Sequence, residues 1–175
     1  LDQNLKNNSF VTFTNTNVWR LGSFYDANVS ALKTKLNSKS NDYFVDFDLK
    51  VSNIIDEETE LGHSWGLETG KQRGNFTFGL NYYEESDTYD PNDLGFLRAN
   101  NERSTRFEIG YRNFNPDFLN LNKFFSNLSI SNRRLYAPNL YGGTYWRGNL
   151  TMISNSFNAM GIRLNGNINE VNDYF

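Results

Sequence analysis

Apolar and polar residues alternate strictly along several stretches of the chain. In residues 75–84 the apolar side chains occupy every second position, at Phe76, Phe78, Leu80 and Tyr82. Successive side chains of a β-strand point to opposite faces, whereas a helix repeats every ~3.6 residues. The pattern therefore predicts a strand with one apolar face and one polar face.

The same period recurs along most of the chain, and no stretch has the period of a helix. The expected strands are Ser9–Val18, Asn28–Leu36, Asp42–Ser52, His63–Lys71, Asn75–Glu84, Thr105–Arg112, Phe124–Arg134, Thr144–Ser154 and Ala159–Asn169. These runs predict an all-β fold, an antiparallel up-and-down meander of about nine strands in one domain over residues 1–175.

The connections between these strands differ in length. Long loops are expected at Trp19–Ala27, at the acidic segment Asn53–Gly62 and at Glu85–Arg103, and short turns at Asn37–Asn41 and Gln72–Gly74. Short turns on one side and long loops on the other are typical of outer-membrane barrels. The connection Asn113–Lys123 interrupts this rhythm because it is longer than a turn.

Two further features favour a membrane barrel over a soluble β-sandwich, which shows the same alternation. The expected strands are mostly as long as the ~9 to 11 residues that a tilted membrane span needs. Aromatic residues near strand ends are typical of the girdles of such barrels. They are Tyr43, Phe44, Trp65, Tyr82, Tyr83, Tyr111, Phe124, Phe125, Tyr145 and Trp146.

Composition adds several exclusions. Aromatic residues make up 16% of the chain although the mean hydropathy is −0.66, which argues against disorder and suits a barrel with a polar lumen. The net charge of −3 without a basic stripe argues against nucleic-acid binding. The absence of cysteine excludes disulfides and thiolate metal sites. No apolar run reaches the length of a transmembrane helix.

Three segments carry a family resemblance: "FVTFTNTNVWRLGSFYDANVSAL" from Phe10, "YDPNDLGFLRANN" from Tyr89 and the closing "NEVNDYF". They resemble the uncharacterised outer-membrane β-barrel domain of Bacteroidota envelope proteins, a barrel that usually follows a periplasmic carbohydrate-binding-like module. The resemblance implies location in the bacterial outer membrane, no established enzymatic activity and a longer barrel than this chain. Leu1 in place of Met favours a mature form or an internal piece. Because Asp173 breaks the final alternation, we interpret Phe175 as a truncation point.

The alternation assigns candidate residues to each face of the sheet. The lumen-facing candidates are Asp46, Asp48, Lys50, Glu68, Arg106, Glu108, Arg112, Arg147 and Arg163. The lipid-facing candidates are Phe76, Phe78, Leu80, Tyr82, Phe107 and Ile109. Because the inward charges have both signs, we expect ion pairing or solvation of the lumen and no strong ion preference.

The loop segment Pro91, Asn92, Asp93, Leu94, Gly95 and Phe96 is a candidate docking element. Pro91 and Gly95 favour a turn, and Leu94 and Phe96 are too apolar for a free outer loop. We expect the segment to fold back onto the barrel or to dock a partner chain.

The leading interpretation is a porin-like outer-membrane protein that acts as a channel, an uptake component or a scaffold within an envelope complex. Its partners would be membrane lipid and other envelope proteins, and no cofactor or metal is expected. His63 is the single histidine and the acidic residues are scattered, so no Ser-His-Asp or paired-carboxylate arrangement can be located and no enzyme is expected. The alternative is a soluble all-β adhesin or carbohydrate-binding module.

Overall fold

The computed structural model describes residues 1–172 and 174, so Asp173 and the proposed truncation point Phe175 lie outside the described residues. The strands are β1 Asp2–Leu5, β2 Ser9–Val18, β3 Asp26–Asn37, β4 Tyr43–Ile55, β5 Thr59–Lys71, β6 Phe76–Glu85, β7 Glu102–Asn113, β8 Leu121–Leu135, β9 Tyr141–Ser154 and β10 Ala159–Asn167. Within the described residues, no helix is long and apolar enough to cross a membrane.

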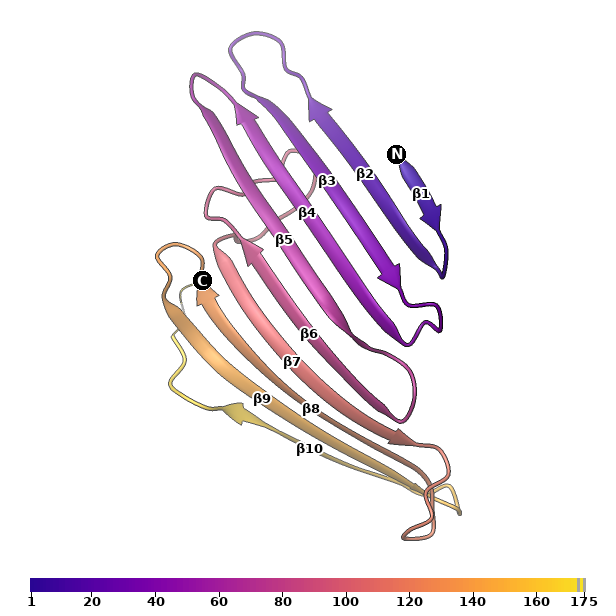
Figure 1. The fold of residues 1–175 in the computed structure, drawn as a ribbon. Coiled ribbons are helices and arrows are strands. Elements are labelled where there is room, and N and C mark those ends of the chain that lie inside the picture. Colours follow the sequence, from indigo (N-terminus) through magenta and orange to yellow (C-terminus); the bar gives the residue numbers. More distant parts are fainter. Residues whose placement is uncertain (173, 175) are drawn as a thin grey trace.

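All ten strands form one antiparallel sheet in the order of the sequence (Figure 1). Each strand pairs with its neighbours along the chain, and β1 and β10 each pair on one side only. The sheet is therefore open. The expected all-β, antiparallel up-and-down meander is confirmed.

The register extends the alternation of single strands into rows that cross the sheet. Directly paired residues share a face, because successive side chains alternate between faces. One row of paired residues runs through Val45, Thr69, Leu80, Phe107, Ile130 and Trp146. The adjacent row, on the opposite face, runs through Asp46, Glu68, Asn81, Arg106, Ser131 and Tyr145. We call these faces the apolar face and the polar face.

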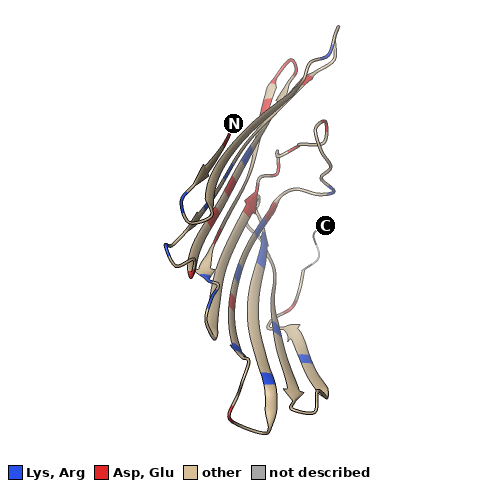
Figure 2. Ribbon diagram, turned by 90° about the vertical axis from the view of Figure 1, so that its right-hand side faces the viewer, with Lys and Arg blue, Asp and Glu red and all other residues tan. Residues whose placement is uncertain are grey.

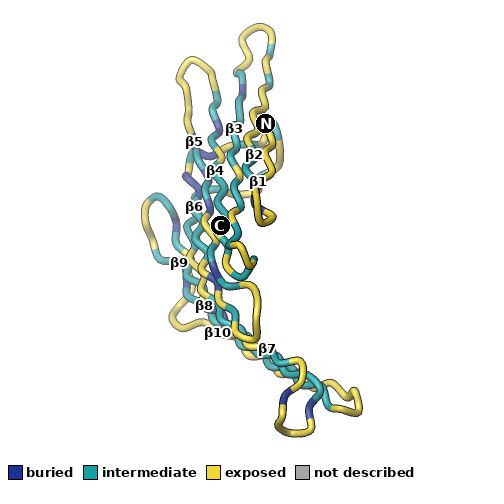
Figure 3. Tube along the Cα trace, turned by 45° about the vertical axis from the view of Figure 1, so that its right-hand side comes forward, coloured by how far each residue is buried: buried dark blue, intermediate teal, exposed yellow. Residues whose placement is uncertain are grey.

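The sheet has no packed second layer. The buried hydrophobic residues among those described are only Ala27, Tyr89, Leu121 and Leu135. Most strand residues are of intermediate exposure, and the loops are exposed (Figure 3). The hydrophobic contacts that usually hold two layers together are therefore missing, and strand pairing holds this chain in shape.

The sheet is strongly curved, and the loop between β6 and β7 lies on its concave side (Figure 2). Glycine permits a tight approach where β5 meets β6. A Cβ atom on Gly70 would lie 2.2 Å from the carbonyl oxygen of Phe78 on β6. Only a residue without a side chain fits so close to the neighbouring backbone.

The prediction of a solvated loop at Asn53–Gly62 is wrong. β4 continues to Ile55 and β5 begins at Thr59, so the connection is residues 56–58. The acidic residues at the tip do not alternate with apolar residues. Backbone hydrogen bonding does not require such alternation, so the hairpin continues beyond the last alternating residue. A long connection at this position, and the loop rhythm that depended on it, are not observed.

Other bounds shift by smaller amounts. β1 was not predicted because it is short and fully exposed, so burial imposes no pattern on it. The connection before β8 is residues 114–120, shorter than the predicted Asn113–Lys123. β9 begins at Tyr141, earlier than the predicted Thr144, and its pairing with β8 shifts by one residue near Gly142. The predicted final strand Ala159–Asn169 ends at Asn167.

Candidate functional site

The structure places all nine lumen-facing candidates on the polar face. Their register is continuous from β4 to β10, so the side chains line one surface; they are Asp46, Asp48, Lys50, Glu68, Arg106, Glu108, Arg112, Arg147 and Arg163. Several form partly or fully exposed ion pairs, including Lys35 with Asp46 at 3.9 Å and Arg106 with Glu108 at 3.5 Å. Exposed pairs at such distances contribute little to stability. Their main effect is to set the charge of the face.

The charges on the polar face are segregated along the sheet, which the sequence did not indicate. The acidic residues Asp46, Asp48 and Glu68 lie on β4 and β5, beside lysines of β3 and β4. The arginines of this face lie on β7 to β10. The face thus has a mixed half and an arginine-rich half.

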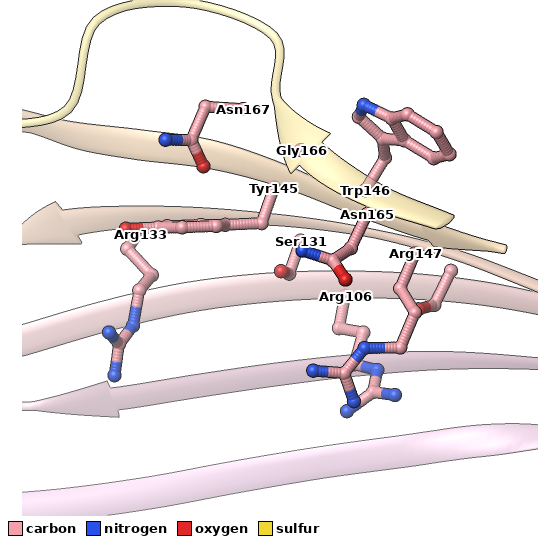
Figure 4. Close-up of a pocket in the computed structure, with 10 residues that line it drawn as sticks. Arg106, Ser131, Arg133, Tyr145, Trp146, Arg147, Asn165, Gly166 and Asn167 are labelled. Carbon is pink, nitrogen blue, oxygen red and sulfur yellow. The ribbon is translucent and has the colours of Figure 1, made fainter. Parts of the chain in front are cut away.

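Arginine side chains surround a hollow of about 570 Å³ in the arginine-rich half (Figure 4). Its lining includes Arg106, Arg133 and Arg147, together with Tyr145 and Asn165. Of these, only Arg106 and Arg147 were predicted to face the lumen, and Tyr145 was predicted as a girdle residue. Arg133, Tyr145 and Asn165 share the parity of the polar face, but their proximity depends on strand order.

The loop of residues 86–101 folds back over the polar face at one end of β4 and β5. The amide of His63 donates to Ser86 Oγ at 2.9 Å, and the Thr88 hydroxyl donates to the carbonyl of Leu61 at 2.8 Å. Further along, the amide of Asp90 donates to Ser52 Oγ at 3.0 Å. The loop therefore crosses β5 and then β4.

Small side chains on the sheet make room for this loop. Ser52 and Ser64 are 1% and 0% exposed, and Tyr89 is 4% exposed. A Cβ atom on Gly62 would lie 2.3 Å from Tyr89 Cα. Serine and glycine at three polar-face positions are the sequence signal for this contact, because they leave a depression among longer charged side chains.

The tip of the loop is joined to the connection between β2 and β3. Asp93 forms a short ion pair with Arg20 and accepts a hydrogen bond from the Tyr25 hydroxyl at 3.3 Å. The Arg20 guanidinium lies 4.3 Å from the centroid of the Tyr25 ring. In the same loop, Phe96 is 88% exposed. The loop thus spans from β6 to the β2–β3 connection and presents Phe96 to its surroundings.

The remaining candidates of this segment form its turn. The amide of Leu94 donates to the carbonyl of Pro91 at 2.8 Å. The side chain of Asn92 accepts from the amide of Leu97 at 2.7 Å, and its own amide donates to Asp90 at 2.7 Å. Gly95 is exposed at the end of this turn. These local bonds hold the tip in one conformation.

Ionisable groups of the two loops are perturbed by their surroundings. The hydrogen bond to Asp93 is the main cause that raises the pKa of Arg20, and it likewise raises the pKa of Tyr25. Burial is the main cause that raises the pKa of Tyr89 to about 12. Tyr89 is therefore neutral between the loop and the sheet at physiological pH.

All six lipid-facing candidates lie on the apolar face and are partly exposed. The exposed fractions are 49% for Phe76, 45% for Leu80 and 46% for Phe107. Phe78, Tyr82 and Ile109 belong to the same face through their pairing. Apolar residues continue across the sheet from Phe13 on β2 to Ile162 on β10, so the apolar surface is wide.

Aromatic residues border both ends of the apolar face. At the end near the long loop, the rings of Trp65 and Tyr82 lie 4.8 Å apart, and both side chains donate to Glu84. His63 lies in this border, with Nε2 3.5 Å from Glu84 and its ring 5.5 Å from Tyr136. At the other end, the ring of Phe124 lies 6.1 Å from Tyr111 and 5.4 Å from Phe118.

Four of the predicted girdle aromatics lie on the polar face instead. Phe44, Tyr83, Phe125 and Tyr145 pair with residues of the polar rows. They were predicted as girdle residues because they lie near strand ends. The alternation of side chains along each strand places them on the polar face. Lys35 Nζ lies 5.5 Å from the Phe44 ring, and Ser64 donates to the Tyr83 hydroxyl at 3.3 Å.

The described residues contain no group of three acidic, histidine or cysteine side chains that could hold a metal ion. The arrangement consists of charged and hydroxyl groups on one face and apolar and aromatic groups on the other.

The whole chain, residues 1–175, matches the family model described as Domain of unknown function (DUF5916). The chain belongs to this family. No curated protein and no solved structure matches it. The description of the DUF5916 family names no activity, so function has to be argued from the two faces of the sheet.

Substitution of Gly62 by alanine tests whether the loop of this DUF5916 member is docked. The added Cβ would overlap Tyr89 Cα, so we expect residues 86–101 to detach and become sensitive to protease. The free energy of unfolding should fall by about 1–3 kcal/mol. Limited proteolysis with mass spectrometry identifies the cleavage sites.

Gly161→Ala is the matched control, because its nearest non-neighbouring atom would lie 3.8 Å from the new Cβ. It should leave the loop protected. If protease cleaves residues 86–101 of the wild type as rapidly as it cleaves a detached loop, the loop is not docked in solution.

Alkaline titration tests the burial of Tyr89. Because its folded pKa is about 12 against an ordinary value near 10, its contribution to stability is complete below pH 10 and is lost as pH rises toward 12. Tyr89→Phe should remove about 1–3 kcal/mol of this loss and lower the amplitude of the tyrosinate absorbance change near pH 12 by one tyrosine. An unchanged titration curve in the variant would contradict burial of the phenol.

Proposed function

We propose that this chain forms part of the wall of a β-barrel in the bacterial outer membrane, with the apolar face toward lipid and the polar face toward the lumen. The observation that carries the proposal is the wide, exposed apolar face of a single-layer sheet. A soluble protein would cover such a surface with a second layer. Lipid provides the same cover without further protein.

Strand length and the borders of the apolar face support this proposal. β2 to β10 contain 9 to 15 residues each, against the ~9 to 11 that a tilted span requires. The cluster of Trp65, Tyr82, Glu84 and Arg103 combines rings with charged groups at one edge of the apolar face. Such a combination suits the boundary between lipid and water.

The sequence resemblance to Bacteroidota outer-membrane barrels points in the same direction. Within this proposal the protein acts as a channel, an uptake component or a scaffold, and the loop of residues 86–101 narrows the lumen at one end. Its ion pair to Arg20 would hold it against the wall. The proposal includes no enzymatic step.

Leu80 and Asn81 provide a test because they are adjacent on β6 and belong to opposite faces. Leu80→Arg should destabilise the vesicle-inserted protein by about 2–4 kcal/mol, because arginine would face the hydrocarbon interior. Asn81→Arg adds the same charge toward the lumen and should cost less than about 1 kcal/mol. Folding into phosphatidylcholine vesicles, followed by denaturant titration, measures the difference.

Wild-type protein should float with the vesicles and resist urea extraction until detergent is added. A folded monomer in buffer without detergent would contradict the proposal and would support the soluble adhesin or carbohydrate-binding module. Equal costs for the two arginine variants would contradict the assignment of the faces.

A further inference from the structure

The hollow on β7 to β10 arises from the order of side-chain sizes across three strands. Arg106 on β7 pairs with Ser131 on β8, and Ser129 on β8 pairs with Arg147 on β9. Neighbouring strands lie ~4.8 Å apart, so the two serines leave a space between the flanking arginines. Arg106 and Arg147 both line this space, and Figure 4 shows both side chains extending over it.

The positive charge of the hollow is only partly balanced. Its lining contains no acidic residue. Arg106 pairs with Glu108 at 3.5 Å, and Arg133 pairs with Glu102 at 3.2 Å, both at exposed positions. Arg147 forms no ion pair with any of the described residues. Guanidinium groups that line the same hollow repel each other, and a bound anion would reduce that repulsion.

Neutral donors complete the lining. The Asn165 side chain lies between Ser131 and Arg147, and the Tyr145 side chain extends toward Arg133 (Figure 4). Trp146 points away from these groups. Hydroxyl and amide donors beside arginine forks match the several acceptor oxygens of a phosphate group.

We propose that this hollow binds the phosphate group of a small solute, with Arg147 and Arg106 as the charged donors and Ser131 and Asn165 as neutral donors. The volume of about 570 Å³ admits a ligand larger than a bare phosphate ion. This inference goes beyond the membrane proposal, because it concerns the opposite face of the sheet. Binding in detergent solution tests it independently of insertion into lipid.

Inorganic phosphate is the probe, titrated into the purified protein in non-ionic detergent at low ionic strength and followed by calorimetry. Wild-type protein should show saturable binding at one site. Arg147→Gln should weaken it by about tenfold or more, since a charge-assisted bidentate contact is lost. Arg106→Gln should act in the same direction.

Lys50→Gln is the matched control. It removes the same charge from the same face, but on β4, where Lys50 Nζ lies 3.7 Å from Asp48. It should change the affinity by less than about twofold. Circular dichroism checks that each variant keeps its strand content, and Arg106→Gln decides the question if Arg147→Gln does not fold.

The proposal is overturned if wild-type protein shows no saturable binding. It is also overturned if Lys50→Gln weakens binding as much as the arginine variants do, because net charge rather than a site would then hold the ion.

Discussion

The antiparallel backbone ladder from β1 to β10 is the interaction on which the rest of the structure depends. With four buried hydrophobic residues in the described chain, side-chain packing cannot fix how the strands are aligned. Hydrogen bonding between neighbours does, and each alignment passes from one pair to the next. A slip of one residue at any pair would exchange the faces of every strand beyond it. The separation of charge from hydrocarbon therefore depends on the register of every pair.

Much of this organisation could be predicted from residue parity. The alternation in β4 and β6 assigned Asp46 and Leu80 to opposite faces, and the structure keeps that assignment across the whole row. The failures occur where burial imposes no pattern. β1 is fully exposed, and the tip of the β4–β5 hairpin is held by backbone pairing at residues that carry no alternation.

The candidate sites were less accessible to sequence reasoning, because they combine residues distant along the chain. Arg106 and Arg147 could be placed on one face, but only the order of β7, β8 and β9 puts two serines between them. The apolar content of the loop indicated that it would not be free. The loop contacts the sheet at Ser52 and Gly62. These small residues form a contact surface only when the strands are paired.

The loop of residues 86–101 also has a mechanical consequence. Hydrogen bonds between strands resist separation of the strands. They resist changes in the curvature of the sheet only weakly. The loop leaves β6, rests on β5 and β4, and is tied by Asp93 to Arg20 in the connection between β2 and β3. It thus links distant parts of the curved sheet. A link of fixed length limits how far the sheet can flatten or curl at this end.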